Sequence, residues 1–130
     1  MIIGYGIDIM KPSRIQGAIK CYGSDFLNRI YTATEIRSAA RKRYHSGVIE
    51  VLTAYWSVKE ATMKALGTGN RHGVRFRDIE VCHESSGRPY INLYGISKEI
   101  ADKLGVKNIV LSMSHLDDVV VAGVIFEGWI

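Results

Sequence analysis

The stretch WSVKEATMKALGTG, residues 56–69, carries the strongest structural prediction in this sequence. With the residues before it, it predicts a long helix over roughly 47–66, because inward-facing side chains recur at steps of three and four. These side chains are Val51, Leu52, Tyr55, Val58, Thr62, Ala65 and Leu66. Gly67 stands where many helices end in a left-handed residue, so it is expected to end this one.

Trp56, Glu60 and Lys64 are four residues apart in turn, so a helix places them along one face. One interpretation is an exposed Glu60–Lys64 ion pair, worth about 0.2–0.5 kcal/mol. The other is a phosphoryl-transfer site, in which the carboxylate holds a divalent cation and the lysine contacts a phosphate. Spacing alone favours the ion pair, so the rest of the chain has to decide.

Composition predicts one globular domain, residues 1–130, because the chain has 130 residues and 47% of them are apolar. No run approaches the roughly 18 apolar residues of a membrane span, and no signal peptide is apparent, so a cytoplasmic protein without membrane contact is expected. Cys21 and Cys82 form no C-x-x-C pair, and the four histidines have no metal-binding spacing. A zinc site is therefore not predicted.

Charge is distributed unevenly along the chain. Residues 11–43 hold eight basic side chains against two acidic ones, a local charge of +6, whereas the whole chain carries +4. The basic residues are Lys11, Arg14, Lys20, Arg29, Arg37, Arg41, Lys42 and Arg43. This field predicts an acidic partner, either nucleic acid or an acidic protein, and its plain alternative is a soluble basic face.

A nucleic-acid-binding module built on this basic segment would need aromatic residues that stack on bases. The aromatic residues available there, Tyr22, Phe26 and Tyr31, fit inward-facing core positions instead. No nucleic acid is therefore expected as a partner.

Patterning and turn signals predict an α+β fold, with a mostly antiparallel sheet packed against one long and several short helices. Thr32 and Glu35 have capping-box spacing, which indicates a helix start. Besides the long helix, we expect strands at 2–9, 78–84, 90–94, 108–114 and 119–127, short helices beginning near 12, 24 and 32, a helix at 97–104, and a tight connection at 115–118.

Asp8 ends the first apolar strand, where a charge is costly to bury unless hydrogen bonds or a metal compensate for it. Its plain alternative, an N-cap for the helix near Ser13, lies too far away along the chain. Asp8 and Glu60 together, with substrate oxygens and waters, would suit Mg²⁺. His115 ends another strand. Three interpretations fit it: a general base, a hydrogen-bond donor to a phosphate, and an ordinary turn residue.

The last strand is apolar at nearly every position from Val119 to Phe126, where a half-solvated strand would alternate. Both of its faces should therefore be covered. A second subunit is one source of that cover, and the same chain is the other.

In order and spacing, the motifs of this chain resemble those of the holo-acyl-carrier-protein synthases, the small bacterial 4′-phosphopantetheinyl transferases. The match runs over nearly the full length. It comprises Gly6-Ile7-Asp8-Ile9, Arg14-Ile15, Phe26-Leu27, Arg29-Ile30-Tyr31-Thr32 with Glu35, the stretch 56–69, Gly87-Arg88-Pro89 and Ser112-Met113-Ser114-His115.

The resemblance implies a reaction and a set of site residues. It implies Mg²⁺-dependent transfer of 4′-phosphopantetheine from coenzyme A to a serine of apo acyl carrier protein, with release of adenosine 3′,5′-bisphosphate. The resemblance assigns Asp8 and Glu60 to the metal and Lys64 to the phosphates. It assigns Lys59, Gly67, Arg88, Pro89, Ser114 and His115 to further coenzyme A contacts. The proton acceptor is expected to be Glu60 acting through a metal-bound water, with His115 or Asp117 as alternatives.

The resemblance also implies a homotrimer with coenzyme A between subunits, and a first basic helix that meets the acidic carrier protein. Arg14, Lys20 and Arg29 are the residues expected at that contact. Two departures stand out: Tyr55-Trp56 replaces the Arg-Phe common in the family, and Met10-Lys11-Pro12 is unusual. The same carboxylates would also serve a Mg²⁺-dependent nucleotide hydrolase, which stays open as an alternative.

Overall fold

Two antiparallel sheets and five α-helices make up the part of the chain that is described, residues 1–129, in this computed structural model. The predicted α+β fold with antiparallel pairing is confirmed. In chain order the elements are β1 (Ile2–Met10), α1 (Pro12–Tyr22), α2 (Ser24–Ile30), α3 (Ala33–Ala40), α4 (His45–Leu66), the 3₁₀ turn η1 (Phe76–Asp78), β2 (Ile79–His83), β3 (Pro89–Leu93), α5 (Gly95–Leu104), β4 (Asn108–Leu116) and β5 (Val119–Glu127).

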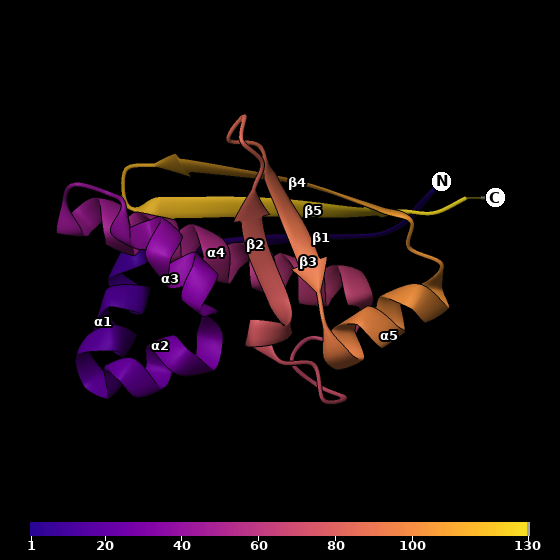
Figure 1. Ribbon diagram of the computed structural model, residues 1–130, viewed down its shortest axis with the longest axis horizontal. Helices are drawn as coiled ribbons and strands as arrows, with labels where there is room; N and C mark the ends of the chain where they lie inside the picture. The colour runs from indigo at the N-terminus through magenta and orange to yellow at the C-terminus, as the bar shows by residue number, and fades with distance from the viewer. Residues whose placement is uncertain (130) are drawn as a thin grey trace.

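The larger sheet has the order β1-β5-β4, so the last strand lies in the middle. Figure 1 shows its three long strands running together, with α4 beneath them, α1–α3 gathered at one end and α5 at the other. β2 and β3 form a separate hairpin. In register, Asp8 of β1 pairs with Ala122 of β5, and Ala122 pairs with Met113 of β4.

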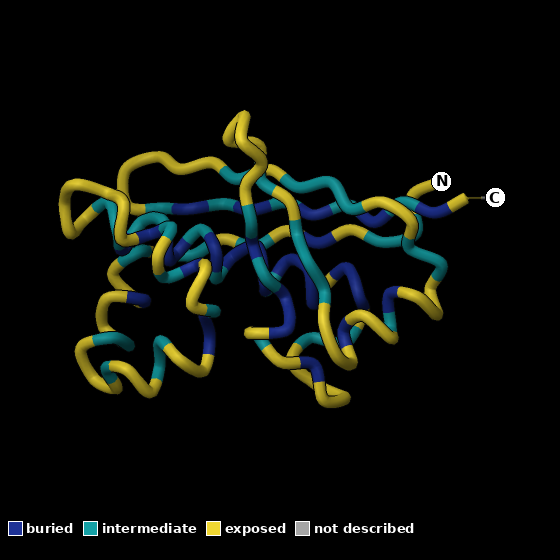
Figure 2. Tube along the Cα trace, viewed as in Figure 1, coloured by how far each residue is buried: buried dark blue, intermediate teal, exposed yellow. Residues whose placement is uncertain are grey.

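Helix α4 covers the inner face of this sheet, and Figure 2 shows that much of this helix is buried. Its buried apolar residues belong to the hydrophobic core. Two glycines of β1 allow the helix backbone to approach closely. A Cβ at Gly4 would lie 2.6 Å from the Ala65 carbonyl oxygen, and one at Gly6 would lie 1.9 Å from that of Ala61. Helix and strand backbones therefore touch along the first half of β1.

The opposite face of the sheet is left uncovered by the described chain. Tyr5, Ile7 and Ile9 point outward from β1 and are 69%, 56% and 64% exposed. Along β5, residues buried against α4 alternate with half-buried residues of the outer face, beginning with Val120 and Val121. The alternative that one chain covers both faces of this strand is therefore wrong.

Two local expectations also need correction. Tyr22 was expected to face inward but is 69% exposed, because α1 ends there, at the rim of the fold. The connection expected at 115–118 is shorter: β4 continues through Leu116, and Asp117, with φ 54°, and Asp118 make the turn. His115 therefore lies within a strand. None of the helices described is long and apolar enough to cross a membrane.

Candidate active site

Asp8, Glu60 and Lys64 meet where α4 crosses β1. Asp8 is an even-numbered residue of β1, so it faces α4 as Gly4 and Gly6 do. The Lys64 ammonium lies 3.5 Å from Asp8 Oδ1 and donates a hydrogen bond of 2.8 Å to the carbonyl oxygen of Ile7. The lysine therefore pairs with Asp8 on the strand, and its side chain, 53% exposed, can still contact a ligand.

The positive charge near Asp8 and Glu60 does not fully compensate their two carboxylates. Asp8 Oδ2 is buried and has no hydrogen-bond partner among the described residues. Burial, followed by the negative charge of Asp8, raises the pKa of the half-buried Glu60 carboxyl, and Lys64 only partly opposes this. An unpaired buried oxygen and a carboxylate that resists ionisation are what a bound cation would relieve.

These donors fit Mg²⁺, which the family resemblance implies. Carboxylate oxygens are its preferred protein ligands, and it is commonly bound by one or two carboxylates with substrate phosphates and waters. Within residues 1–129 no cluster of three or more acidic, histidine or cysteine side chains could hold a metal ion. A site of two carboxylates agrees with an ion that takes its other ligands from the substrate.

Lys59 is placed differently from the expectation. Its side chain is fully buried, and its ammonium lies 2.9 Å from Glu35 Oε1, whose side chain is also fully buried. Burial lowers the pKa of Lys59, and the charge of Glu35 opposes that shift. The prediction that Lys59 contacts coenzyme A is therefore wrong in this structure, because its ammonium is inside the core.

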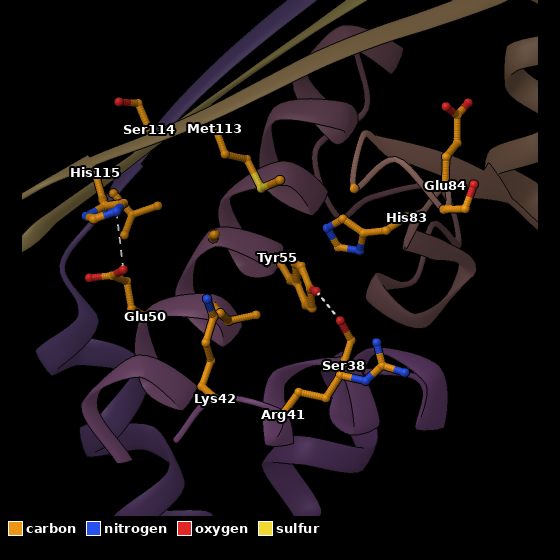
Figure 3. Close-up of a pocket in the computed structure, with 15 residues that line it drawn as sticks. Ser38, Arg41, Lys42, Glu50, Tyr55, His83, Glu84, Met113, Ser114 and His115 are labelled. Atoms are coloured by element: carbon orange, nitrogen blue, oxygen red, sulfur yellow. Dashed lines mark hydrogen bonds and ion pairs between the residues drawn. The ribbon is translucent and has the colours of Figure 1, made fainter. Parts of the chain in front are cut away.

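A pocket of about 670 Å³ opens on the other side of α4 (Figure 3). Its walls come from the end of α3, the first half of α4, the β2–β3 turn and the end of β4. Ser38 and Tyr55 are joined across it by a hydrogen bond of 2.8 Å. Arg41, Lys42 and His83 add groups that can bind an anion.

His115 lies at the rim of this pocket, where its Nε2 is 3.4 Å from Glu50 Oε1 (Figure 3). Ser114 points to the opposite face of β4, as neighbouring strand residues do. The β2–β3 turn brings Gly87 to the same pocket, and Arg88 and Pro89 follow it directly. Glu50 and His83 were not predicted as site residues, because neither belongs to a recognisable motif.

The structure thus places the predicted site residues in two separate groups within one chain. Asp8, Glu60 and Lys64 lie at the β1 edge, and none of them lines the pocket at the β4 edge. With β5 between them, the two edge strands are about 10 Å apart. Gly67 has the predicted left-handed conformation, with φ 81°, and ends α4 beyond Lys64.

The predicted partner-binding residues Arg14, Lys20 and Arg29 are exposed on α1 and α2. Between these helices and Glu60 lies an aromatic stack. Trp56 stacks on Phe76 with ring centroids 4.6 Å apart, and on Phe26 at 6.1 Å. Trp56 lies one turn before Glu60, so the basic surface and the carboxylates adjoin the same stretch of α4.

Comparison with known proteins identifies the family. A family model described as the 4′-phosphopantetheinyl transferase superfamily matches residues 4–123. The chain belongs to this superfamily. A holo-acyl-carrier-protein synthase of Solibacter usitatus is 46% identical over 127 residues, which cover 98% of this chain and 99% of the relative.

Solved structures of other superfamily members share the fold. The holo-acyl-carrier-protein synthase of Neisseria meningitidis has a TM-score of 0.85 and 34% identity, and the match covers 98% of this chain and 99% of that one. The synthase of Helicobacter pylori, solved in complex with coenzyme A, has a TM-score of 0.79 and 30% identity over 95% of this chain and 99% of that one. The predicted family is confirmed. The relatives are named holo-acyl-carrier-protein synthases, which is the predicted enzyme class.

Proposed function

We propose that this protein transfers 4′-phosphopantetheine from coenzyme A to a serine hydroxyl of an apo acyl carrier protein, with Mg²⁺, and releases adenosine 3′,5′-bisphosphate. The observation that carries the proposal is the grouping of Asp8, Glu60 and Lys64, with an unpaired buried oxygen on Asp8. The superfamily membership and a relative solved with coenzyme A support it.

In the proposed reaction the serine oxygen attacks the phosphorus that bears pantetheine. A P–O bond to the serine forms, the P–O bond to the adenosine bisphosphate breaks, and the bisphosphate carries away the electron pair. Asp8 and Glu60 would hold the Mg²⁺, which supplies charge neutralisation on the pyrophosphate when bound. Lys64, whose side chain is half exposed beside Asp8, would steady the charge that develops on the phosphate oxygens.

Glu60 is the group we propose as proton acceptor. Burial and the charge of Asp8 raise its pKa in the metal-free protein, and a bound cation would oppose that shift, so the proposed role rests on the position of Glu60. It also lies on the same helix face as Trp56, toward the basic surface from which the carrier protein would approach. His115 is 61% exposed and sits at the other edge of the sheet, so it fits the coenzyme A contacts better than proton transfer within one chain.

We propose that the complete site forms between subunits of a homotrimer. Gly67 and Lys64 of one copy would meet Arg88, Pro89, Ser114 and His115 of another. Two observations support this: one chain keeps the two groups on opposite sheet edges, and the outer sheet face exposes Tyr5, Ile7 and Ile9. An apolar face of this kind is usually buried by another protein surface.

The carrier protein is proposed to dock on α1 and α2. Arg14, Lys20 and Arg29 are exposed there and would meet acidic side chains of the carrier. Docking at this end of the fold would bring the acceptor serine along Trp56 toward Glu60.

The decisive assay incubates the protein with coenzyme A, Mg²⁺ and apo carrier protein, and measures bisphosphate release with the mass of the carrier. The proposal predicts release only with carrier present, matched by a gain of one phosphopantetheinyl group. Release without carrier would identify the nucleotide hydrolase instead. Steeply salt-dependent binding to generic DNA, without transfer, would favour the nucleic-acid-binding module.

A further inference from the structure

A buried ion pair that takes no part in the proposed chemistry lies directly beside it. Lys59 and Glu60 are consecutive residues of α4, so their side chains leave the helix about 100° apart. Glu60 faces Asp8 on β1, and Lys59 faces η1 and β2. The same turn of helix therefore carries a proposed metal ligand on one side and a buried ammonium on the other.

The Lys59 ammonium uses all three of its protons. It donates to Glu35 Oε1 at 2.9 Å, to the Phe76 carbonyl oxygen at 3.0 Å and to the Ile79 carbonyl oxygen. Phe76 belongs to η1 and Ile79 begins β2. A rotation of α4 about its axis would break these hydrogen bonds together.

Glu35 is held equally firmly from the other side. Its Oε1 also accepts the backbone N–H of Thr32 at 2.9 Å, and its Oε2 accepts that of Val81 at 2.8 Å. The Thr32–Glu35 contact is half of the predicted capping box, which the structure confirms. One fully hydrogen-bonded pair therefore joins α3, α4, η1 and β2.

The attraction between the two charges alone gives a poor reason for this arrangement, although the pair also satisfies backbone groups of η1 and β2. Apolar residues of similar volume often replace a buried ion pair at no cost, or with a gain in stability. What apolar residues do not supply is a single fixed orientation. The carboxylate of a side chain at the rim of a helix lies about 6 Å from the axis, so a 20° rotation of the helix moves it by about 2 Å.

The glycine contacts of β1 fix only the distance of α4 from the sheet. The close approach of Gly6 to Ala61 limits how near the helix lies, and contact between backbones leaves rotation about the helix axis less constrained. Metal ligands need placement to within about 0.5 Å, and Mg²⁺ demands near-octahedral geometry. Rotation of α4 is the motion that would break the hydrogen bonds between Lys59 and η1, β2 and Glu35.

We propose that the Glu35–Lys59 pair is a positioning pair, which fixes the rotation of α4 and thereby holds the Glu60 carboxylate opposite Asp8. This inference rests on the proposed metal site. Neither Glu35 nor Lys59 touches the substrate, because both side chains are fully buried.

The test replaces both charges at once, with Glu35→Leu/Lys59→Met, which keeps the side-chain volumes similar. Manganese binding is measured by electron paramagnetic resonance, with coenzyme A present and no carrier protein, beside thermal melting of the same samples. We expect a lower melting temperature, because the Val81 N–H and the Phe76 and Ile79 carbonyl groups lose their side-chain partners, and, in the protein that remains folded, a dissociation constant for Mn²⁺ raised at least tenfold. Replacement of the exposed α5 pair, Lys98→Gln/Asp102→Asn, is the matched control and should change neither quantity.

Unchanged Mn²⁺ affinity in a folded double variant would overturn the positioning role. If the double variant does not fold, the same Mn²⁺ titration is made on Glu35→Gln, which removes one charge and keeps the side-chain shape. Weaker Mn²⁺ binding by this variant supports the positioning role, and unchanged binding refutes it. Asp8→Asn separates this inference from the proposed function. Should Asp8→Asn bind Mn²⁺ as tightly as the unmodified protein, the metal site itself is wrong.

Discussion

Gly6→Ala tests whether close contact between α4 and β1 creates the metal site. A Cβ at Gly6 would lie 1.9 Å from the Ala61 carbonyl oxygen, 2.8 Å from its carbonyl carbon and 3.0 Å from Lys64 Cβ. The first two atoms are backbone, so no side-chain rotation relieves the clash. Strand and helix must separate by about 1 Å, more than the roughly 0.5 Å tolerance of a metal site.

The stability cost follows from the same contacts. Overpacking a core typically costs 1–3 kcal/mol, and a clash against rigid backbone belongs at the upper end. Alanine loses less backbone entropy on folding than glycine, which offsets about 0.5–1 kcal/mol. The expected net loss in free energy of unfolding is therefore about 2 kcal/mol, small enough for the variant to remain folded at 25 °C.

Urea unfolding measures this loss, and Mn²⁺ affinity with phosphopantetheine transfer measures the effect on the site. Gly17→Ala is the matched control, since a Cβ at Gly17, inside α1, meets nothing within 4 Å. We expect that variant to gain about 0.5–1 kcal/mol in stability and to keep its Mn²⁺ affinity. A Gly6→Ala variant with normal transfer would show that this contact does not set the site geometry.

Three further predictions concern single features. With Mg²⁺ present, Glu60→Gln should abolish transfer. Without metal, Glu60→Gln should become more stable than the unmodified protein as pH rises through the raised pKa of Glu60, because Glu60 binds a proton more tightly in the fold than in the unfolded chain. Melting of both proteins should show this difference vanish below about pH 4.5. Because water screens the half-buried Glu60, the gain in free energy of unfolding should stay under about 1 kcal/mol. Lys64→Arg should slow transfer and Lys64→Ala should slow it more, whereas a lysine that only pairs with Asp8 would leave kinetics unchanged and move melting by less than about 1 kcal/mol. Arg14→Glu/Lys20→Glu should raise KM for the carrier and flatten its salt dependence while KM for coenzyme A stays constant, and an equal rise in both would place these residues at the nucleotide.

Sequence periodicity was sufficient to predict the main helices and strands, because periodicity reflects which side of a single helix or strand is buried. The capping box of α3 and the left-handed Gly67 follow from local backbone chemistry, and both were predicted correctly. Alternation was harder to interpret in β5. Its outer face is apolar too, so the sequence could not distinguish cover by the same chain from cover by another surface.

Tertiary pairing explains the site residues that sequence reasoning misplaced. Lys59 and Glu60 are both charged residues of one motif, and only the packing of η1 and β2 against α4 shows that one is buried and the other half-buried. Glu35 was identified for its capping contact alone, because nothing local indicates a lysine 24 positions further along the chain as its partner. His115 and Glu50 are likewise brought together only by the β4–α4 contact.

The most direct measurement of the proposed activity is the intact mass of apo acyl carrier protein after incubation with coenzyme A and this protein, with and without Mg²⁺. Asp8→Asn and Glu60→Gln serve as paired variants. The proposed mechanism predicts a gain of one 4′-phosphopantetheinyl group with Mg²⁺ and the unmodified protein, and none when the ion or either carboxylate is missing. A carrier mass that stays unchanged under every condition, or that rises equally with both folded variants, would contradict it.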